Sequence, residues 1–266
     1  AADLLPELKG KPVIGSAQAP NLERIAELRP DLVIAYEMWM TQEAFEGRLA
    51  PLGIPVARMH CYRVERLDSD IRTLGKIAGR EKEAEEYIAY FQRFLGEVTS
   101  RLQDAAPRVR VYAESYREYS TVARGSGADT LLDLAGVDNI ALKQPVPFPT
   151  ISPEWVVERN PQAIVKVSSS QWLKMGYNVT DLDALVAFRQ GIMNRPAWHR
   201  IEAVKTGRVL LLSNEIWTGP RAPVGILYIA KWCYPERFAD IDPEAVHRDW
   251  LLKWHGKELK GVYVYP

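Results

Sequence analysis

The sequence has few of the residues and motifs on which catalysis and redox chemistry usually depend. Only two cysteines, Cys61 and Cys233, occur in 266 residues, and they show no CxxC spacing. Two isolated thiols in a chain of this size are more often unpaired core residues than a disulfide, although the spacing excludes neither. The GxSxG, GxxxxGKS/T, HExxH and GxGxxG motifs are missing, and the four histidines are scattered. We therefore expect no enzymatic activity, no resident cofactor and no metal site built from protein ligands.

The chain also has no excess of either charge and no long apolar run. It contains 34 Lys and Arg residues and 34 Asp and Glu residues. Binding to phosphates normally requires a clear basic excess, so we expect no nucleic acid partner. No apolar run approaches the roughly 20 residues that span a bilayer. The first residues show neither the basic start nor the apolar stretch of a signal peptide. Composition does not decide whether the chain is mature, truncated or cytoplasmic.

One helix–strand pattern occurs twice in the chain. Segments 21–35 and 152–165 each read as an N-cap residue, a short helix, a proline that ends it, and a continuous apolar run. The two prolines, Pro30 and Pro161, are 131 residues apart, and the other matching positions keep the same offset. A continuous apolar run is typical of a strand that is covered on both faces. Two related α/β lobes explain this repetition better than one domain does.

Between the two copies the chain is almost free of helix breakers. Over 66–104 apolar residues recur at helical spacing, with one interruption expected at Gly79 and Arg80. A helix of about 24 residues from Glu81 would be about 36 Å long at 1.5 Å per residue, which is enough to bridge two lobes. A long surface helix on a single domain fits the same spacing equally well.

Aromatic and arginine side chains follow every predicted strand. The strands are expected at 32–35, 56–59, 109–112, 164–167 and 209–212, and later helices at 130–135, 222–232 and 243–254. Ligands of doubly wound sheets bind beyond the carboxyl ends of the strands, and aromatic rings commonly line sites for flat, partly apolar ligands. For any one residue core packing is the commoner role, but the shared position of the set predicts a ligand-binding cleft. Its expected members are Tyr36, Trp39, His60, Tyr62, Tyr116, Arg117, Arg124, Trp172, Trp217 and Arg221.

Segment 21–35 resembles the signature of the class III periplasmic binding proteins, which serve ATP-driven importers of iron-siderophores, haem and cobalamin. Further segments fit this family in the same order along nearly the whole chain. They are 74–79, 130–140, 152–161, 198–209 and 219–221. The strand, helix and strand with which members begin do not precede position 21, so the first lobe is expected to be incomplete at its N-terminus. The tail 239–266 resembles a prokaryotic subset of the family, for which the resemblance implies no particular ligand.

The resemblance implies an α/β fold of two Rossmann-like lobes that are bridged by a long α-helix, with the ligand held between the lobes. We place the N-terminal lobe at 1–66, the bridging helix at 67–104 and the C-terminal lobe at 105–266. The resemblance further implies a monomer that delivers its ligand to the permease of an ABC importer. Such a protein would be periplasmic, or extracellular and anchored to the membrane.

The resemblance also implies docking onto the permease through one acidic residue on each lobe, which by position are Glu23 and Glu154. Each lies in the first turn of a helix that runs antiparallel to the following strand, so its N-terminus is expected at the ligand-binding end of that strand. Both carboxylates would then lie on one outer rim, where permease arginines can pair with them. The plainer interpretation is that each complements a helix dipole, which is worth about 0.3–1 kcal/mol.

The residue types also favour a class of ligand. Arg117, Arg124 and Arg221 favour carboxylate, catecholate, phosphate or oxyanion groups, and the aromatic residues favour a broad organic face. We therefore expect a metal complex of the iron-siderophore, haem or cobalamin kind. Two alternatives stay open. One is a binding protein for a small oxyanion such as molybdate or tungstate, and the other is a chelatase-like α/β enzyme, for which His60 near Glu65 is the candidate pair.

Overall fold

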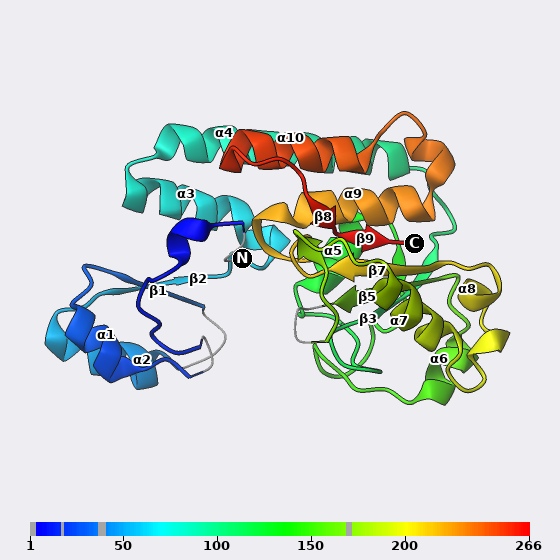
Figure 1. Ribbon diagram of the computed structural model, residues 1–266, viewed down its shortest axis with the longest axis horizontal. Coiled ribbons are helices and arrows are strands. Elements are labelled where there is room, and N and C mark those ends of the chain that lie inside the picture. The colour runs from blue at the N-terminus through cyan, green and yellow to red at the C-terminus, as the bar shows by residue number, and fades with distance from the viewer. Residues whose placement is uncertain (1–3, 17–18, 37–40, 169–171) are drawn as a thin grey trace.

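Two lobes of unequal size lie side by side in the computed structural model, which describes residues 4–16, 19–36, 41–168 and 172–266 (Figure 1). The small lobe contains α1 (Leu22–Leu28), β1 (Val33–Tyr36), α2 (Gln42–Leu49) and β2 (Val56–Met59). β1 and β2 pair in parallel. The buried residues of this lobe form a separate core, made of Ile25, Val33, Phe45, Leu49 and Ile54. The small lobe therefore folds around its own apolar cluster.

The two copies of the repeated segment fold alike. α1 corresponds to α6 (Pro153–Arg159), and β1 corresponds to β5 (Ala163–Ser168). The side-chain oxygens of Asn21 and Ser152 accept hydrogen bonds from the backbone N–H three residues later, at 2.9 and 3.2 Å. Both helices end on a residue in the left-handed region, Arg29 with φ 44° and Asn160 with φ 42°, which stops the helix just before its proline. The predicted repeat is confirmed, including its caps.

Segment 66–104 forms two helices that meet at the predicted interruption. The 3-10 turn η3 (Val64–Arg66) leads into α3 (Leu67–Ala78), Gly79 ends that helix with a φ of 62°, and α4 (Glu81–Leu102) follows. The 22 residues of α4 give a length of about 33 Å at 1.5 Å per residue. In Figure 1 this helix runs along one side of both lobes. The expected bridging segment is thus a helical hairpin whose second helix has the necessary length.

The large lobe is built on a five-stranded sheet with the order β4-β3-β5-β7-β9. Its strands are β3 (Arg110–Glu114), β4 (Asp138–Asn139), β5, β7 (Val209–Ser213) and β9 (Val264–Tyr265). All neighbours pair in parallel except β7 and β9. A second, two-stranded antiparallel sheet joins β6 (Gly176–Tyr177) to β8 (Gly261–Val262). Because β3, β5 and β7 run in parallel, their carboxyl ends share one edge of the sheet.

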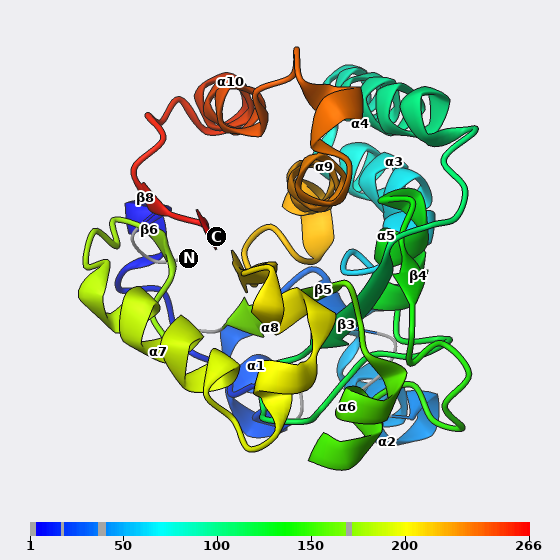
Figure 2. The same cartoon turned by 90° about the vertical axis from the view of Figure 1, so that its right-hand side faces the viewer.

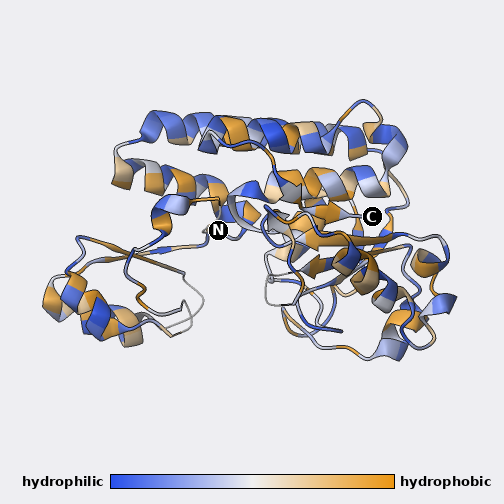
Figure 3. Cartoon of the chain, viewed as in Figure 1, coloured by the Kyte–Doolittle hydropathy of each residue, from blue (hydrophilic) through white to orange (hydrophobic). Residues whose placement is uncertain are grey.

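Helices cover both faces of this sheet, and the strands alternate between two cores. Tyr112 and Ile164 belong to one core, whereas their neighbours Ala113 and Val165 belong to the other. The remaining helices are α5 (Ala128–Leu134), α7 (Asp183–Met193), α8 (Glu202–Lys205), α9 (Ala222–Cys233) and α10 (Pro243–His255). Figure 3 shows the central strands of the sheet and much of α9 as apolar. This is the doubly wound arrangement that the continuous apolar runs predict.

The observed elements lie close to their predicted positions. β2 begins and ends as expected, and the strand predicted at 109–112 is displaced by one residue at its start and two at its end. The start of the chain departs from the expected lobe boundary, because Leu4 packs in the main core together with Val64 and Leu67. Within the described residues, no helix is both long and apolar enough to cross a membrane.

Candidate functional site

The loops that follow β5 and β7 are linked to each other at the carboxyl edge of the large sheet. The backbone N–H of Asn214, just after β7, donates to the carbonyl of Ser168 at the end of β5, at 2.9 Å. The Ser168 hydroxyl donates in turn to the carbonyl of Leu173, at 2.6 Å. These contacts fix the start of each loop relative to its neighbour. Side chains carried by the loops are therefore presented from one common edge.

A buried group of three charged residues supports the loop that follows β3. Glu114, Lys166 and Arg195 are 1, 1 and 8% exposed. Both terminal nitrogens of Arg195 donate hydrogen bonds to the Glu114 carboxylate, Nη1 to Oε2 at 2.6 Å and Nη2 to Oε1 at 2.9 Å. The ammonium of Lys166 lies 3.0 Å from Glu114 Oε1. Because the charges are paired within hydrogen-bond distance, the burial of all three is tolerated.

Neighbouring residues complete the environment of this ion cluster. The Tyr112 hydroxyl and the backbone N–H of Tyr119 donate to Glu114 Oε2, at 3.2 and 3.1 Å. The Arg195 guanidinium also lies over the rings of Tyr119 and Trp198, at 4.8 and 4.5 Å from their centroids. Burial acts to raise the pKa of Glu114, but the hydrogen bonds and charges of Arg195 and Lys166 together hold that pKa below its usual value. Glu114 is therefore a carboxylate at neutral pH.

Sequence reasoning did not select the members of this ion cluster as site residues. A signal was present for two of them, because Lys166 interrupts the apolar run of β5 and Glu114 ends the apolar run of β3. A charged side chain inside a strand covered on both faces requires a buried partner. Arg195 gave no comparable signal, since it lies in a turn after α7.

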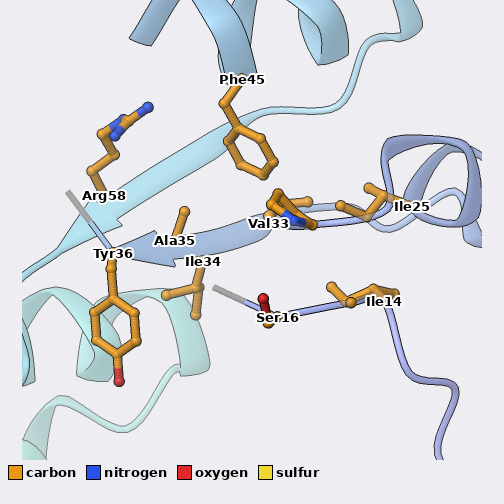
Figure 4. A pocket seen from close by; sticks show the side chains of 11 residues that line it. Ile14, Ser16, Ile25, Val33, Ile34, Ala35, Tyr36, Phe45 and Arg58 are labelled. Atoms are coloured by element: carbon orange, nitrogen blue, oxygen red, sulfur yellow. The ribbon is translucent and has the colours of Figure 1, made fainter. Parts of the chain in front are cut away.

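On the small lobe the expected aromatic residues gather where β1 and β2 end. The rings of Tyr36 and Tyr62 meet edge to face with centroids 5.8 Å apart, and His60 and Tyr62 do the same at 6.0 Å. Figure 4 shows Tyr36 and Ile34 on the face of β1 opposite Phe45. That uncovered face leaves Ile34 and Tyr36 52 and 45% exposed. A pocket of about 190 Å³ lies beside β1 and includes both residues.

Arg63, the residue after Tyr62, connects the aromatic group of the small lobe to the large lobe. Arg63 Nη2 donates to the carbonyl of Gly125 at 2.9 Å, and its guanidinium lies 5.8 Å from the Tyr62 ring centroid. A Cβ atom built on Gly127 would lie 3.1 Å from the Arg63 side chain and 3.7 Å from the Tyr62 ring. Gly127, with φ 79°, therefore permits the close approach of the two lobes. Tyr62 is therefore a predicted residue that lies at this junction.

The predicted residues of the large lobe divide into exposed and packed groups. Tyr116 and Trp172 are 38 and 57% exposed, and Arg117 is also exposed. Trp217 is only 3% exposed and belongs to the main core, so its ring contributes to packing and offers almost no surface to a ligand. Trp39 lies outside the described residues.

Two predicted arginines have surroundings of different kinds. Arg124 is exposed and lines a hollow with Arg108 and Arg110 along β4, at the outer edge of the sheet. It is therefore not grouped with Tyr116 and Arg117. Arg221 is mostly buried, and its Nη2 donates to Glu215 at 2.8 Å. Its charge is already balanced by a carboxylate, which leaves less of it for a ligand anion.

The remaining candidates for metal or redox chemistry are the two cysteines and the pair His60 and Glu65. Cys61 and Cys233 are both free thiols, and burial raises the pKa of Cys61. Glu65, which the chelatase alternative would pair with His60, lies 3.4 Å from Arg63 Nη1. Across the residues that the structure describes, no three His, Cys, Asp or Glu side chains are grouped to hold a metal ion.

The two predicted docking residues lie on one side of the molecule. Glu23 and Glu154 are exposed residues in the first turns of α1 and α6. Figures 1 and 2 both show α1 and α6 on the side opposite α4 and α10. Neither carboxylate forms an ion pair with another described residue. The arrangement leaves both charges available to a partner.

Comparison with known proteins identifies relatives of this chain. The vitamin B12-binding protein of Pectobacterium carotovorum is 31% identical over 167 residues, which cover 62% of this chain. The matched region is 60% of that relative, so the chain spans about three-fifths of the curated relatives' length. The TroA-like periplasmic binding protein FepB from Veillonella parvula has a TM-score of 0.84 at 23% identity, covering 99% of this chain and 80% of that one.

A second solved structure and the family match complete the comparison. The molybdate periplasmic binding protein MolA from Haemophilus influenzae has a TM-score of 0.80 at 21% identity, covering 98% of this chain and 82% of that one. At these identities the two structures establish the fold alone. Residues 3–216 match the family described as periplasmic binding protein. The match covers most of the chain, in agreement with the fold, and the chain therefore belongs to the periplasmic binding protein family.

Proposed function

We propose that this protein is the extracytoplasmic solute-binding component of an ABC importer and that it captures a metal complex between its two lobes. Membership of the periplasmic binding protein family supports the binding role. The observation that carries the ligand class is the 31% identity to a vitamin B12-binding protein over 167 residues. Among iron-siderophores, haem and cobalamin-like complexes, a corrinoid is therefore the first candidate.

The chemistry of the exposed residues agrees with a ligand of this class. Tyr36, His60 and Tyr62 form a continuous aromatic group at the carboxyl ends of β1 and β2. Tyr116 and Arg117 are exposed on the loop after β3. A metal complex with a broad organic ligand presents an apolar face to such rings and polar groups to an arginine. The proposed binding surface combines the two sets.

Delivery to a permease and the location of the protein belong to the same proposal. Glu23 and Glu154 would pair with one basic residue on each half of the permease. The protein would act as a monomer, in the periplasm or anchored to the outer face of a membrane. Its role would be capture and release of the ligand, with no chemical change to it.

Titration of intrinsic tryptophan fluorescence tests the proposal, because Trp172 is 57% exposed. The purified protein is titrated with vitamin B12 and other corrinoids, haem, ferric siderophores, molybdate and tungstate. We expect saturable quenching by a metal complex, with corrinoids the tightest. Saturation by molybdate or tungstate alone would replace the ligand class with a small oxyanion. Insertion of free metal into a tetrapyrrole would replace the binding role with a chelatase, and no response to any compound would contradict the proposal.

A further inference from the structure

Three consecutive backbone carbonyls converge on one buried ammonium group. Lys166 Nζ donates to the carbonyl oxygens of Ser115, Tyr116 and Arg117, at 2.5, 3.2 and 3.4 Å. Lys166 comes from the middle of β5, whereas the three carbonyls belong to the loop that follows the neighbouring strand β3. An ammonium group has three N–H donors and no acceptor. Four acceptors surround this one, the three carbonyls and Glu114 Oε1 at 3.0 Å, so the lysine holds the carbonyls by sharing its hydrogens among them and the carboxylate.

The other end of the same loop is held by the partner of Lys166. Glu114 Oε2 accepts the backbone N–H of Tyr119 at 3.1 Å. The Ser115 N–H donates to the Ser120 carbonyl at 2.7 Å, which closes the base of the loop. Tyr119 has φ 57°, a left-handed conformation that a residue with a bulky side chain seldom adopts. The loop from 115 to 119 is thus fixed by contacts at both ends.

Stabilisation of the core is a poor explanation for these buried charges. Replacing a buried ion group by apolar side chains of similar volume is often neutral or stabilising. What an apolar core lacks is the set of donors for three carbonyls and the acceptor for the Tyr119 N–H. The ion cluster of Glu114, Lys166 and Arg195 therefore provides a defined loop conformation.

The inward carbonyls leave the side chains of the loop available at the surface. Tyr116 is 38% exposed and Arg117 is exposed. The Arg117 guanidinium forms no hydrogen bond or ion pair with any described residue. Two side chains suited to an aromatic and an anionic or polar ligand group are therefore presented by a backbone that is already ordered. Ordering a backbone costs conformational entropy, and this loop is ordered before any ligand binds.

We propose that Lys166 is a positioning residue that, through Ser115, Tyr116 and Arg117, holds the loop after β3 in its ligand-binding conformation. Tyr116 and Arg117 make the contacts with the ligand, and Lys166 acts through them without touching it. This assignment rests on the proposed function for its ligand, but the ordering of the loop by Lys166 does not. The ordering of the loop and the affinity for ligand are therefore measured separately.

The variant that tests the loop is Lys166→Met. Methionine has a similar length and no N–H donors, and its introduction leaves Glu114 and Arg195 as a neutral pair. Amide hydrogen exchange is measured without any ligand. We expect exchange of the hydrogen-bonded amides of this loop, those of Ser115, Tyr119 and Ser120, to become about ten- to hundredfold faster, while the amides of β3 and β5 stay unchanged. The control is Lys205→Met, an exposed lysine on α8, which removes one positive charge and is expected to leave the loop unaltered.

Unchanged exchange at the amides of Ser115, Tyr119 and Ser120 in Lys166→Met would overturn the proposal. Equally faster exchange throughout β3 and β5 would also overturn it, because the residue would then serve general stability. Both results are independent of ligand, so they decide the positioning role even if the wild-type protein binds none of the compounds in the titration panel. Failure of that panel would refute the proposed function instead.

The ligand measurement uses vitamin B12. We expect Lys166→Met to weaken its binding about ten- to hundredfold, since the loop must be ordered on binding. In a Tyr116→Ala and Arg117→Ala background the same Lys166→Met change is expected to have little further effect, because the side chains through which it acts are gone. A full, additive loss in that background, or unchanged affinity with a loosened loop, would contradict the assignment.

Discussion

Glu23 and Glu154 occupy the same position in two copies of one helix, 131 residues apart in the chain and on one side of the molecule. Each follows its N-cap residue by two positions, and each cap accepts a hydrogen bond from the residue after the glutamate. The equivalence therefore extends from sequence register to local geometry. A pair of equal charges, one on each lobe, is what the proposed docking onto a permease requires.

Replacing both glutamates is expected to separate transport from binding. Glu23→Ala with Glu154→Ala should abolish ligand uptake in cells that depend on this binding protein, while the affinity of the purified protein stays unchanged. The matched control is Glu27→Ala with Glu158→Ala, a pair with the same offset one turn further along the two helices. That control should transport normally. Normal uptake by the first double variant would refute docking through these residues.

The sequence predicted the elements and their repetition well because both depend on local signals. N-cap residues, prolines and continuous apolar runs act within a few positions of one another, and they specify α1, β1, α6 and β5. The break at Gly79 followed from the same reasoning. Side-chain surroundings depend instead on partners far apart in the chain. Arg195, for example, lies 81 positions from the carboxylate that it contacts.

The predicted site residues divide in the same way, into those whose placement depends on local signals and those whose surroundings depend on distant partners. Tyr36 and Tyr62 were correctly placed at strand ends, and their mutual contact follows from the parallel pairing of β1 and β2. Trp217 also follows a strand, but the turn after β7 carries its ring into the main core. The positions of the strand ends therefore predict which loops form a site, but they do not predict which side chains of those loops are exposed.

His247 is expected to make the protein less stable as the pH falls below about 6.5. Its ring is fully buried and meets Tyr263 with centroids 4.4 Å apart. Burial, followed by the charge of Arg221, lowers the pKa of His247 to about 3. Between about pH 6.5 and 3 the unfolded chain binds a proton at this position that the folded protein excludes. The free energy of unfolding should therefore fall by about 1.4 kcal/mol per pH unit from this residue.

Urea denaturation of His247→Phe between pH 7 and 4 measures this contribution. The slope of the free energy of unfolding against pH should be smaller than in the wild type by about 1.4 kcal/mol per pH unit, which is the contribution of one proton. His199→Phe, at an exposed position, is expected to retain the wild-type slope. An unchanged slope in His247→Phe would show that other groups cause the acid sensitivity.

Gly225 is expected to be required for the packing of α9. A Cβ atom at this position would collide with the carbonyl oxygen of Ile216 in the turn after β7. Alanine would gain about 1 kcal/mol of helix propensity, but the backbone clash should outweigh it, with a net loss of about 1–3 kcal/mol. Gly96 in α4 has no atom within 4 Å of its Cβ position. Gly96→Ala should therefore stabilise by about 0.5–1 kcal/mol, and equal urea midpoints for the two variants would contradict this account.

The charge balance of the buried ion cluster predicts which member is most important for stability. Glu114→Gln would leave Lys166 and Arg195 as two buried cations beside only the exposed carboxylate of Glu118, 3.5 Å from Arg195 Nη2. This should destabilise the protein by about 3–5 kcal/mol. Lys166→Met leaves a neutral pair and should cause a clearly smaller loss. Because the folded-state pKa of Glu114 lies below its usual value, its contribution is present above about pH 4.5 and is lost as the pH falls through that lowered pKa. Urea midpoints at pH 7 check the order, and a Glu114→Gln variant as stable as Lys166→Met would show that the carboxylate does not compensate both cations.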